Sequence, residues 1–229
     1  MTSAARFLKA RDYLLTHRDD YERVRQDFSW PALDKFNWAL DYFDVMAANN
    51  SDVALWIVDE NGSETKHTFA DLSSRSNRVA NLLRKLGTRR GDHLLVMLGN
   101  EAPLWEVFLA AMKLGAVVIP ATPLLTTEDL RHRMERGHVR HVIAAAAYTA
   151  KFPELAGSYT RISTGERVFG WHSLDDADDH AVSFTPDGLT AAHDHLLLYF
   201  TSGTTANPKL VQPELFTRLR FCGDQCRSF

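Results

Sequence analysis

The spacing of apolar residues changes repeatedly along the chain and divides it into helical and extended stretches. The first fifty residues look helical, because Phe36, Leu40 and Phe43 recur at helical spacing before a polar break at residues 49–52. Two extended runs, VALWIVD and SETKHTF, then lie on either side of the turn ENG. A tight turn of this kind between two extended runs predicts a β-hairpin over residues 53–69.

After the hairpin, helical spacing alternates with short apolar runs. Helices are expected over residues 69–86, over residues 102–114 and from Thr126 or Thr127 onward, and strands over residues 93–99, 116–121 and 138–146. The connections between them are short, and the strands are apolar almost throughout. This pattern is typical of strands that are buried on both faces. The sequence therefore predicts an α/β fold, with a parallel-rich sheet covered by helices on both faces.

The pattern becomes less regular between residues 150 and 190. The acidic run DDADD, residues 175–179, is interpreted as a solvated surface loop, since its carboxylates are not spaced like those of a calcium-binding loop. Residues 196–200, LLLYF, then predict one more buried strand.

Composition and charge exclude several classes of protein. The net charge of the 229 residues is −3, with 45% hydrophobic and 24% charged residues, so no broad basic surface is expected for nucleic acid or an anionic membrane. No apolar run approaches the roughly 20 residues that span a bilayer. The N-terminus lacks the features of a secretory signal, and its aspartates argue against a mitochondrial leader. Both cysteines, Cys222 and Cys226, lie in the last eight residues. A reducing, cytoplasmic location is the expectation.

The stretch YFTSGTTANPKLV, residues 199–211, carries the clearest candidate chemistry. It follows a predicted buried strand, and ligands bind at the carboxyl ends of such strands in open α/β sheets. Its hydroxyl groups, the conformational freedom of Gly203 and the positive charge of Lys209 all suit a polyphosphate. The spacing is not that of a Walker A loop. An unspecialised loop rich in serine and threonine is the alternative that composition alone leaves open.

The same stretch resembles the phosphate-loop signature of the adenylate-forming superfamily, which includes acyl-CoA synthetases, luciferases and the adenylation domains of peptide synthetases. Ala206 stands where that family most often has glycine. The segments HTFADLSSRSNRVANLLRKLGTRRGDHLLVML and EVFLAAMKLGAVVIPATPLLTTEDLRHRM are similar to two further family segments. FNWALDYFD resembles medium-chain and acetate-type acyl-CoA synthetases more than the other branches. The resemblance covers about residues 30–211.

The resemblance implies a reaction in which ATP and a carboxylic acid give an acyl-adenylate and pyrophosphate, after which coenzyme A displaces AMP to form a thioester. It implies ATP, Mg²⁺ and coenzyme A as substrates and cofactors, and small molecules rather than nucleic acid as partners. It places no catalytic residue and no metal ligand in this chain. The residues that it assigns to ATP phosphate binding are Thr201, Ser202, Gly203, Thr204, Thr205, Ala206, Asn207, Pro208 and Lys209.

The resemblance stops after Val211, and the tail QPELFTRLRFCGDQCRSF has no counterpart in the family. We therefore expect a helical segment over residues 1–50, part of the AMP-binding domain over residues 51–211 and an aberrant tail over residues 212–229. A frameshift or an incorrect gene end would explain the tail, and a short C-terminal helix is the alternative. On this interpretation the isolated chain forms no adenylate, and the competing function is an inactive fragment that at most binds nucleotide or a protein partner.

Three histidines in RHRMERGHVRH, His132, His138 and His141, are also candidates for a metal site. Their spacing matches no common ligand motif, so a solvated helix face that leads into a strand is the preferred interpretation.

Overall fold

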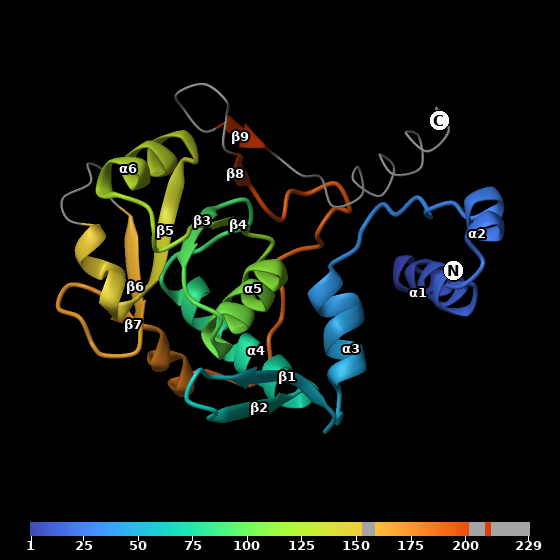
Figure 1. Cartoon of the computed structure of the whole chain (residues 1–229), viewed down its shortest axis with the longest axis horizontal. Helices are drawn as coiled ribbons and strands as arrows, with labels where there is room; N and C mark the ends of the chain where they lie inside the picture. The colour runs from blue at the N-terminus through green and yellow to red at the C-terminus, as the bar shows by residue number, and fades with distance from the viewer. Residues whose placement is uncertain (153–158, 202–208, 212–229) are drawn as a thin grey trace.

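A five-stranded parallel sheet with strand order β4-β3-β5-β6-β7 lies at the centre of the molecule. The structure is a computed structural model, and it describes residues 1–152, 159–201 and 209–211 (Figure 1). The strands of this sheet are β3 (His93–Met97), β4 (Val117–Pro120), β5 (Val139–Ala145), β6 (Thr160–Thr164) and β7 (His172–Ser173). The helices that pack on it are α4 (Phe69–Lys85), α5 (Ala102–Leu114) and α6 (Thr127–Arg136).

Side chains that alternate along the strands bury two separate apolar layers. Leu94 and Val96 of β3 point to one face and pack with residues of α4 and α5. Leu95 and Met97 point to the other face and pack with α6. Alternation of this kind is what the pleat of a strand dictates, and burial on both faces explains why β3 is apolar almost throughout. The predicted α/β fold, with helices on both faces of a parallel sheet, is confirmed.

The helix ends follow local signals in the sequence. Thr68 and Asp71 form a capping box at the start of α4, and Thr126 and Asp129 form one at the start of α6. Helix α5 has the predicted bounds and ends at Gly115, whose φ of 69° is left-handed. A Cβ at Gly115 would lie 3.1 Å from Cγ of Arg90, so glycine is favoured there by backbone conformation and by space.

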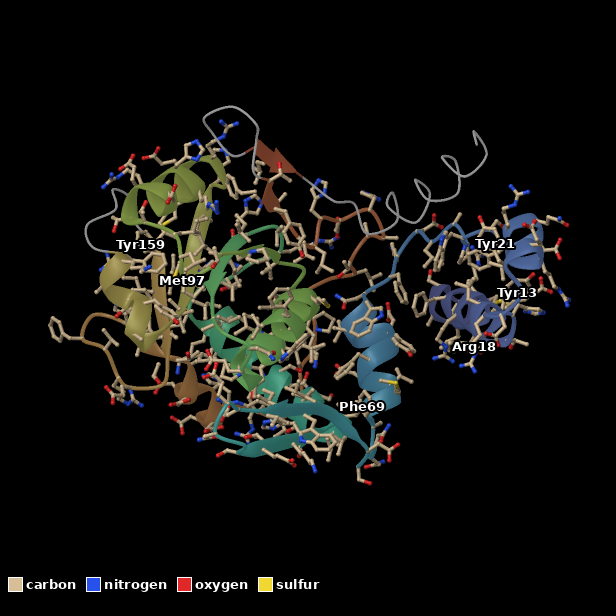
Figure 2. All side chains as sticks on the ribbon, in the orientation of Figure 1. Tyr13, Arg18, Tyr21, Phe69, Met97 and Tyr159 are labelled. Carbon is tan, nitrogen blue, oxygen red and sulfur yellow. The ribbon has the colours of Figure 1, made fainter. Side chains whose placement is uncertain are left out.

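The predicted hairpin is present as the antiparallel pair β1 (Val53–Val58) and β2 (Glu64–Thr68). The N-terminal region contains α1 (Ser3–Thr16), α2 (Tyr21–Asp27), the π-helix η1 (Trp38–Phe43) and α3 (Asp44–Ala47). Figure 2 labels Tyr13 and Tyr21 on α1 and α2, which lie to one side of the sheet. Helix α1 reaches the rest of the molecule through Phe7, whose ring centroid lies 4.9 Å from that of Phe36. Residues 28–37 between these helices contain no helix, which limits the prediction that the first fifty residues are helical.

Residues 160–179 differ from the prediction of irregular structure. Strands β6 and β7 extend the parallel sheet, although β6, TRIST, has too few apolar residues to indicate a buried strand. The acidic run does not form a loop, although three of its four aspartates, Asp175, Asp178 and Asp179, are exposed. It forms the 3₁₀ helix η3 (Leu174–Asp179), in which Leu174 and Ala177 are buried against the α4 layer. The carboxylate of Asp178 pairs with Arg75 of α4, a partner far away in the sequence.

The predicted strand over residues 196–200 is divided in two. Leu197 pairs with Val118 in parallel, so this segment adds to the outer edge of β4. Tyr199 then begins β8 (Tyr199–Thr201), which forms an antiparallel pair with β9 (Lys209–Val211). Leu198 is buried, as expected, but Tyr199 is exposed, at 38%.

His141 lies inside the sheet near its amino edge and not on a solvated face, so the prediction for this histidine is wrong. It is 3% exposed, and its Nε2 lies 3.4 Å from Oδ2 of Asp92. Burial lowers the pKa of His141, and the hydrogen bond and charge of Asp92 oppose this shift. The charge of nearby Arg140 lowers the same pKa further.

Lys113 of α5 is a buried cation that joins three helices. Its Nζ lies 2.8 Å from Oδ1 of Asp44 in α3 and donates to Oγ of Ser76 and Oδ1 of Asn77 in α4, at 2.8 and 2.7 Å. Burial lowers the pKa of Lys113, and Asp44 opposes this shift through its charge and hydrogen bond. A buried charge is tolerated only when it is paired and fully hydrogen-bonded, so Asp44 holds α3 against α4 and α5.

Replacement of Asp44 by asparagine is expected to lower the free energy of unfolding by about 3 kcal/mol, since Lys113 would remain buried without its counter-charge. Urea denaturation monitored by circular dichroism measures this change. Asp59→Asn is the matched control, because Asp59 is an exposed carboxylate with no side-chain partner among the described residues. Equal effects of the two substitutions would contradict the assigned role of Asp44.

The free energy of unfolding is expected to fall as the pH drops below the ordinary histidine pKa of about 6.5. The folded-state pKa of His141 lies below that of the unfolded chain, so the unfolded state binds more protons in this window and acid favours it. Urea denaturation between pH 7.5 and 5 in His141→Gln should show a shallower loss than in the wild type. His172→Gln, at an exposed position, should leave the wild-type slope unchanged. An unchanged slope in His141→Gln would refute the assignment.

Candidate functional site

The candidate site lies where the chain leaves the outer edge of β4. The backbone N–H of Val118 donates to the carbonyl of Leu196 at 2.9 Å, and the N–H of Leu198 donates to the carbonyl of Val118 at 2.9 Å. These bonds add residues 196–198 to the sheet as a further parallel segment. Strand β8 follows at once, so its end at Thr201 lies toward the carboxyl edge of the sheet (Figure 1). Ligand sites of open α/β sheets lie at this edge.

The two ends of the Ser/Thr-rich motif are brought together by the β8–β9 pair. Thr201 and Lys209 are Cα partners, as are Phe200 and Leu210. Thr201 is exposed. The other predicted phosphate-binding residues, 202–208, lie outside the described residues, and so does the predicted tail over residues 212–229. The described residues therefore place the first and last residues of the predicted site in direct register.

An apolar base supports this hairpin on the α6 side of the sheet. Leu198 is buried with Val117 and Ile119 of β4, and Phe200 and Leu210 pack against the same cluster. The side chain of Leu197 points the other way, toward the α5 layer. Alternation of Leu197 and Leu198 between the two faces continues the pleat of the sheet up to the start of β8.

Helix α6 supplies a cation that contacts the hairpin. The guanidinium carbon of Arg133 lies 5.1 Å from the ring centroid of Phe200, within the range of a cation–π interaction. His132 lies on the same side, with its ring centroid 6.4 Å from that of Phe200. Burial lowers the pKa of Arg133, while the charge of Asp129 opposes this shift. Nε of Arg133 is buried and makes no hydrogen bond to the described residues.

Glu101 lies between β3 and α5, on the carboxyl side of β3. Burial raises its pKa, and the backbone of Gly99 opposes the shift through a hydrogen bond. Sequence reasoning singled out neither Glu101 nor Arg133. The position of Glu101 directly after an apolar strand was the available signal for that residue, because the turns after parallel strands converge on one edge. Arg133 had no such signal, since its contact with Phe200 joins segments far apart in the sequence.

The candidate metal ligands do not come together in the described part of the chain. His132 lies beside Phe200 on α6, whereas His141 lies near the amino edge of the sheet next to Asp92. Within residues 1–152, 159–201 and 209–211, no group of three His, Cys, Asp or Glu side chains is placed to hold a metal ion. Cys222 and Cys226 lie outside this part. No helix in the same ranges is long and apolar enough to cross a membrane.

Comparison with solved structures places the fold among acyl-CoA synthetases and related ligases. The acyl-CoA synthetase of Brucella canis superposes with a TM-score of 0.76 at 21% identity, over 88% of this chain and 39% of that one. The anthranilate CoA ligase AuaEII superposes with a TM-score of 0.70 at 21% identity, over 83% of this chain and 36% of that one. The parallel sheet and its helices thus match the N-terminal part of these folds.

The sequence also matches curated relatives. It is 29% identical over 206 residues to the mitochondrial acyl-coenzyme A synthetase ACSM4 of Rattus norvegicus, covering 85% of this chain and 35% of the relative. It is 31% identical over 188 residues to the uncharacterized acyl–CoA ligase YtcI of Bacillus subtilis, covering 81% of this chain and 35% of the relative. The chain spans about a third of the length of these relatives. Residues 43–224, which are most of the chain, match the AMP-binding enzymes, and the protein belongs to that family.

Proposed function

We propose that residues 201–209 bind the triphosphate of ATP in an acyl-CoA synthetase reaction. The observation that carries this proposal is the β8–β9 pair, which holds Thr201 opposite Lys209 at the carboxyl edge of the sheet in a member of the AMP-binding family. The hydroxyl groups of the motif are donors for phosphate oxygens, and Lys209 supplies a positive charge. Thr201 itself is exposed.

In the proposed reaction a carboxylate oxygen of the acid attacks the α-phosphorus of ATP, and the bond to the bridging oxygen of pyrophosphate breaks. The thiol of coenzyme A then attacks the acyl carbon and releases AMP. Donors at residues 201–209 would orient the β- and γ-phosphates and stabilise negative charge as it develops on the leaving pyrophosphate. A Mg²⁺ ion bound to the triphosphate would share that charge. Among the described residues we assign none as its ligand.

The substrate is proposed to be a small carboxylic acid. Relatives that match this chain are named as acyl-CoA synthetases, and one from Metallosphaera sedula, 32% identical over 185 residues, is named as a 4-hydroxybutyrate–CoA ligase. The resemblance of FNWALDYFD favours the medium-chain and acetate-type branch. The division into a helical segment over residues 1–50, an AMP-binding part over residues 51–211 and a separate tail stays a prediction, as does the cytoplasmic location.

A second candidate function is nucleotide binding without turnover. The described residues favour it in one respect, since they place Thr201 opposite Lys209 for a phosphate and we assign none of them to acyl transfer. Exchange of labelled pyrophosphate into ATP in the presence of short- and medium-chain acids separates the two functions. Acid-dependent exchange supports the ligase, whereas ATP binding without exchange supports the second candidate.

ATP binding is the step that Lys209→Ala tests most directly. Loss of a charge-assisted hydrogen bond to phosphate is expected to weaken ATP binding by roughly tenfold to a hundredfold, measured by isothermal titration calorimetry. Lys85→Ala removes the same charge from an exposed position in the last turn of α4 and should leave the affinity unchanged. The absence of ATP binding by the wild-type chain, or equal affinities for wild type and Lys209→Ala, would refute the proposed role of the motif.

A further inference from the structure

A long connection without helix or strand brings the chain from η3 to the outer edge of β4. We name residues 180–196 the strap. In Figure 1 it is part of the orange trace that leaves η3 near α4 and rises toward β8. Much of the strap is exposed, including Val182 and Leu189, at 52% and 65%. Apolar burial therefore gives only part of its position, mainly through Phe184, which packs against the α4–α5 layer.

Polar side chains of α4 hold the first half of the strap by its backbone. Nδ2 of Asn81 donates to the carbonyls of Ala181 and Ser183, at 3.0 and 2.9 Å. Arg78 donates to the carbonyl of His180 at 3.1 Å and also to that of Asp178.

Two further residues of the same helix face continue this pattern. Asn77 donates to the carbonyl of Val182 at 2.8 Å, and Arg84 donates to that of Thr185 at 2.8 Å. Positions 77, 81 and 84 are three or four residues apart, and so are 78 and 81. All four side chains therefore lie on one face of α4. We name these four donors the α4 ladder.

The second half of the strap is held at residues 189, 190 and 194 by Phe36, Asn37 and Arg90. The backbone N–H of Phe36 donates to the carbonyl of Thr190 at 3.1 Å, and Nδ2 of Asn37 donates to Oγ1 of Thr190 at 2.8 Å. Arg90 donates to the carbonyl of Leu189 and pairs with Asp194. The strap is thus bonded along its length before it reaches Leu196.

The sequence that follows the strap does not specify its own register on β4. Residues 196–198 are three consecutive leucines. A slip that moves Leu196 and Leu197 into the places of Leu197 and Leu198 would replace leucine with leucine on both faces of the sheet. Register in a sheet is normally set by the alternation of apolar and polar side chains, and that alternation is missing here. Another part of the molecule must therefore fix which leucine meets Val118.

We propose that the bonds to the strap, beginning with the α4 ladder, fix this register, and that Arg78 and Asn81 are positioning residues for the segment that leads into the site. By fixing the carbonyls of residues 180–183, the ladder brings the strap to its second set of bonds at residues 189–194, and these set how much chain is left to reach Val118. Leu197 is then the leucine that pairs, and Thr201 falls opposite Lys209. The effect on nucleotide binding rests on the proposed function above, whereas the effect on strand pairing does not.

The pairing is measured by hydrogen exchange at the amide of Leu198, which donates to Val118. In the double variant Arg78→Met, Asn81→Leu, this amide should exchange roughly tenfold faster than in the wild type, while the amides of β3 keep their rates. The single variant Arg78→Lys keeps a cationic donor and wild-type Asn81. Its Leu198 amide should therefore retain most of the protection. Lys85→Met, on the same helix without a contact to the strap among the described residues, should have no effect.

Two results would overturn the proposal. One is an unchanged exchange rate at Leu198 in the double variant. The other is an equal acceleration at Leu198 and in β3, because that would indicate general destabilisation and not loss of pairing. Nuclear Overhauser contacts between Val118 and Leu197 give an independent reading, and they should weaken in the double variant alone.

Titration with ATP then separates this proposal from the proposed function. If the wild-type chain binds ATP, the affinity of the double variant should be lower by roughly fivefold or more. Part of its population would have a misplaced Thr201. Wild-type affinity in a double variant with a deprotected Leu198 would overturn the positioning role. If the wild-type chain does not bind ATP, the proposed function fails, and hydrogen exchange still decides whether the ladder helps to fix the register.

Discussion

Val118 is the residue on which the geometry of the candidate site depends. Its N–H and carbonyl that face outward from β4 are both used to hold residues 196–198. A parallel addition of this kind needs a long connection, because the chain must return to the same end of the sheet before it can pair. The strap supplies that return, and its bonds to α4, to Asn37 and to Arg90 limit the paths that it can take. The β8–β9 pair and the contact between Phe200 and Arg133 follow from where this return ends.

Where residues close together in the sequence decide the structure, the sequence was sufficient to predict it. Helix α5 could be bounded at Ala102 and Leu114, because a proline in its first turn and Gly115 after its end are both read within a few residues. The layering of helices on both faces followed from strands that are apolar on both sides. The hairpin over β1 and β2 followed from a tight turn between extended runs.

Where contacts between residues far apart in the sequence decide the structure, the sequence was not sufficient to predict it. The acidic run was assigned to a loop because nothing near it in the sequence indicates the helix η3, in which Asp178 pairs with Arg75 of α4. Strand β6 is short and partly polar, and it gains its place by pairing with β5 and β7. At the site, the motif predicted the phosphate-binding residues through a family resemblance, and their role stays a prediction, while the structure places Thr201 opposite Lys209. Arg133 was missed, because Phe200 reaches α6 only after the strap has crossed the molecule.

Recognition of the strap through its carbonyls has a consequence for sequence variation among relatives. Every residue has a carbonyl, so the identities of exposed strap residues such as Val182 and Ser183 are free to change without loss of these bonds. The donors do not have this freedom, because only a side chain with N–H groups of the right length can replace Asn81. An alignment of relatives that share this connection should therefore vary along the strap and remain constrained on one polar face of α4. Substitutions on that face of α4 would change where residues 196–201 lie relative to the proposed phosphate site.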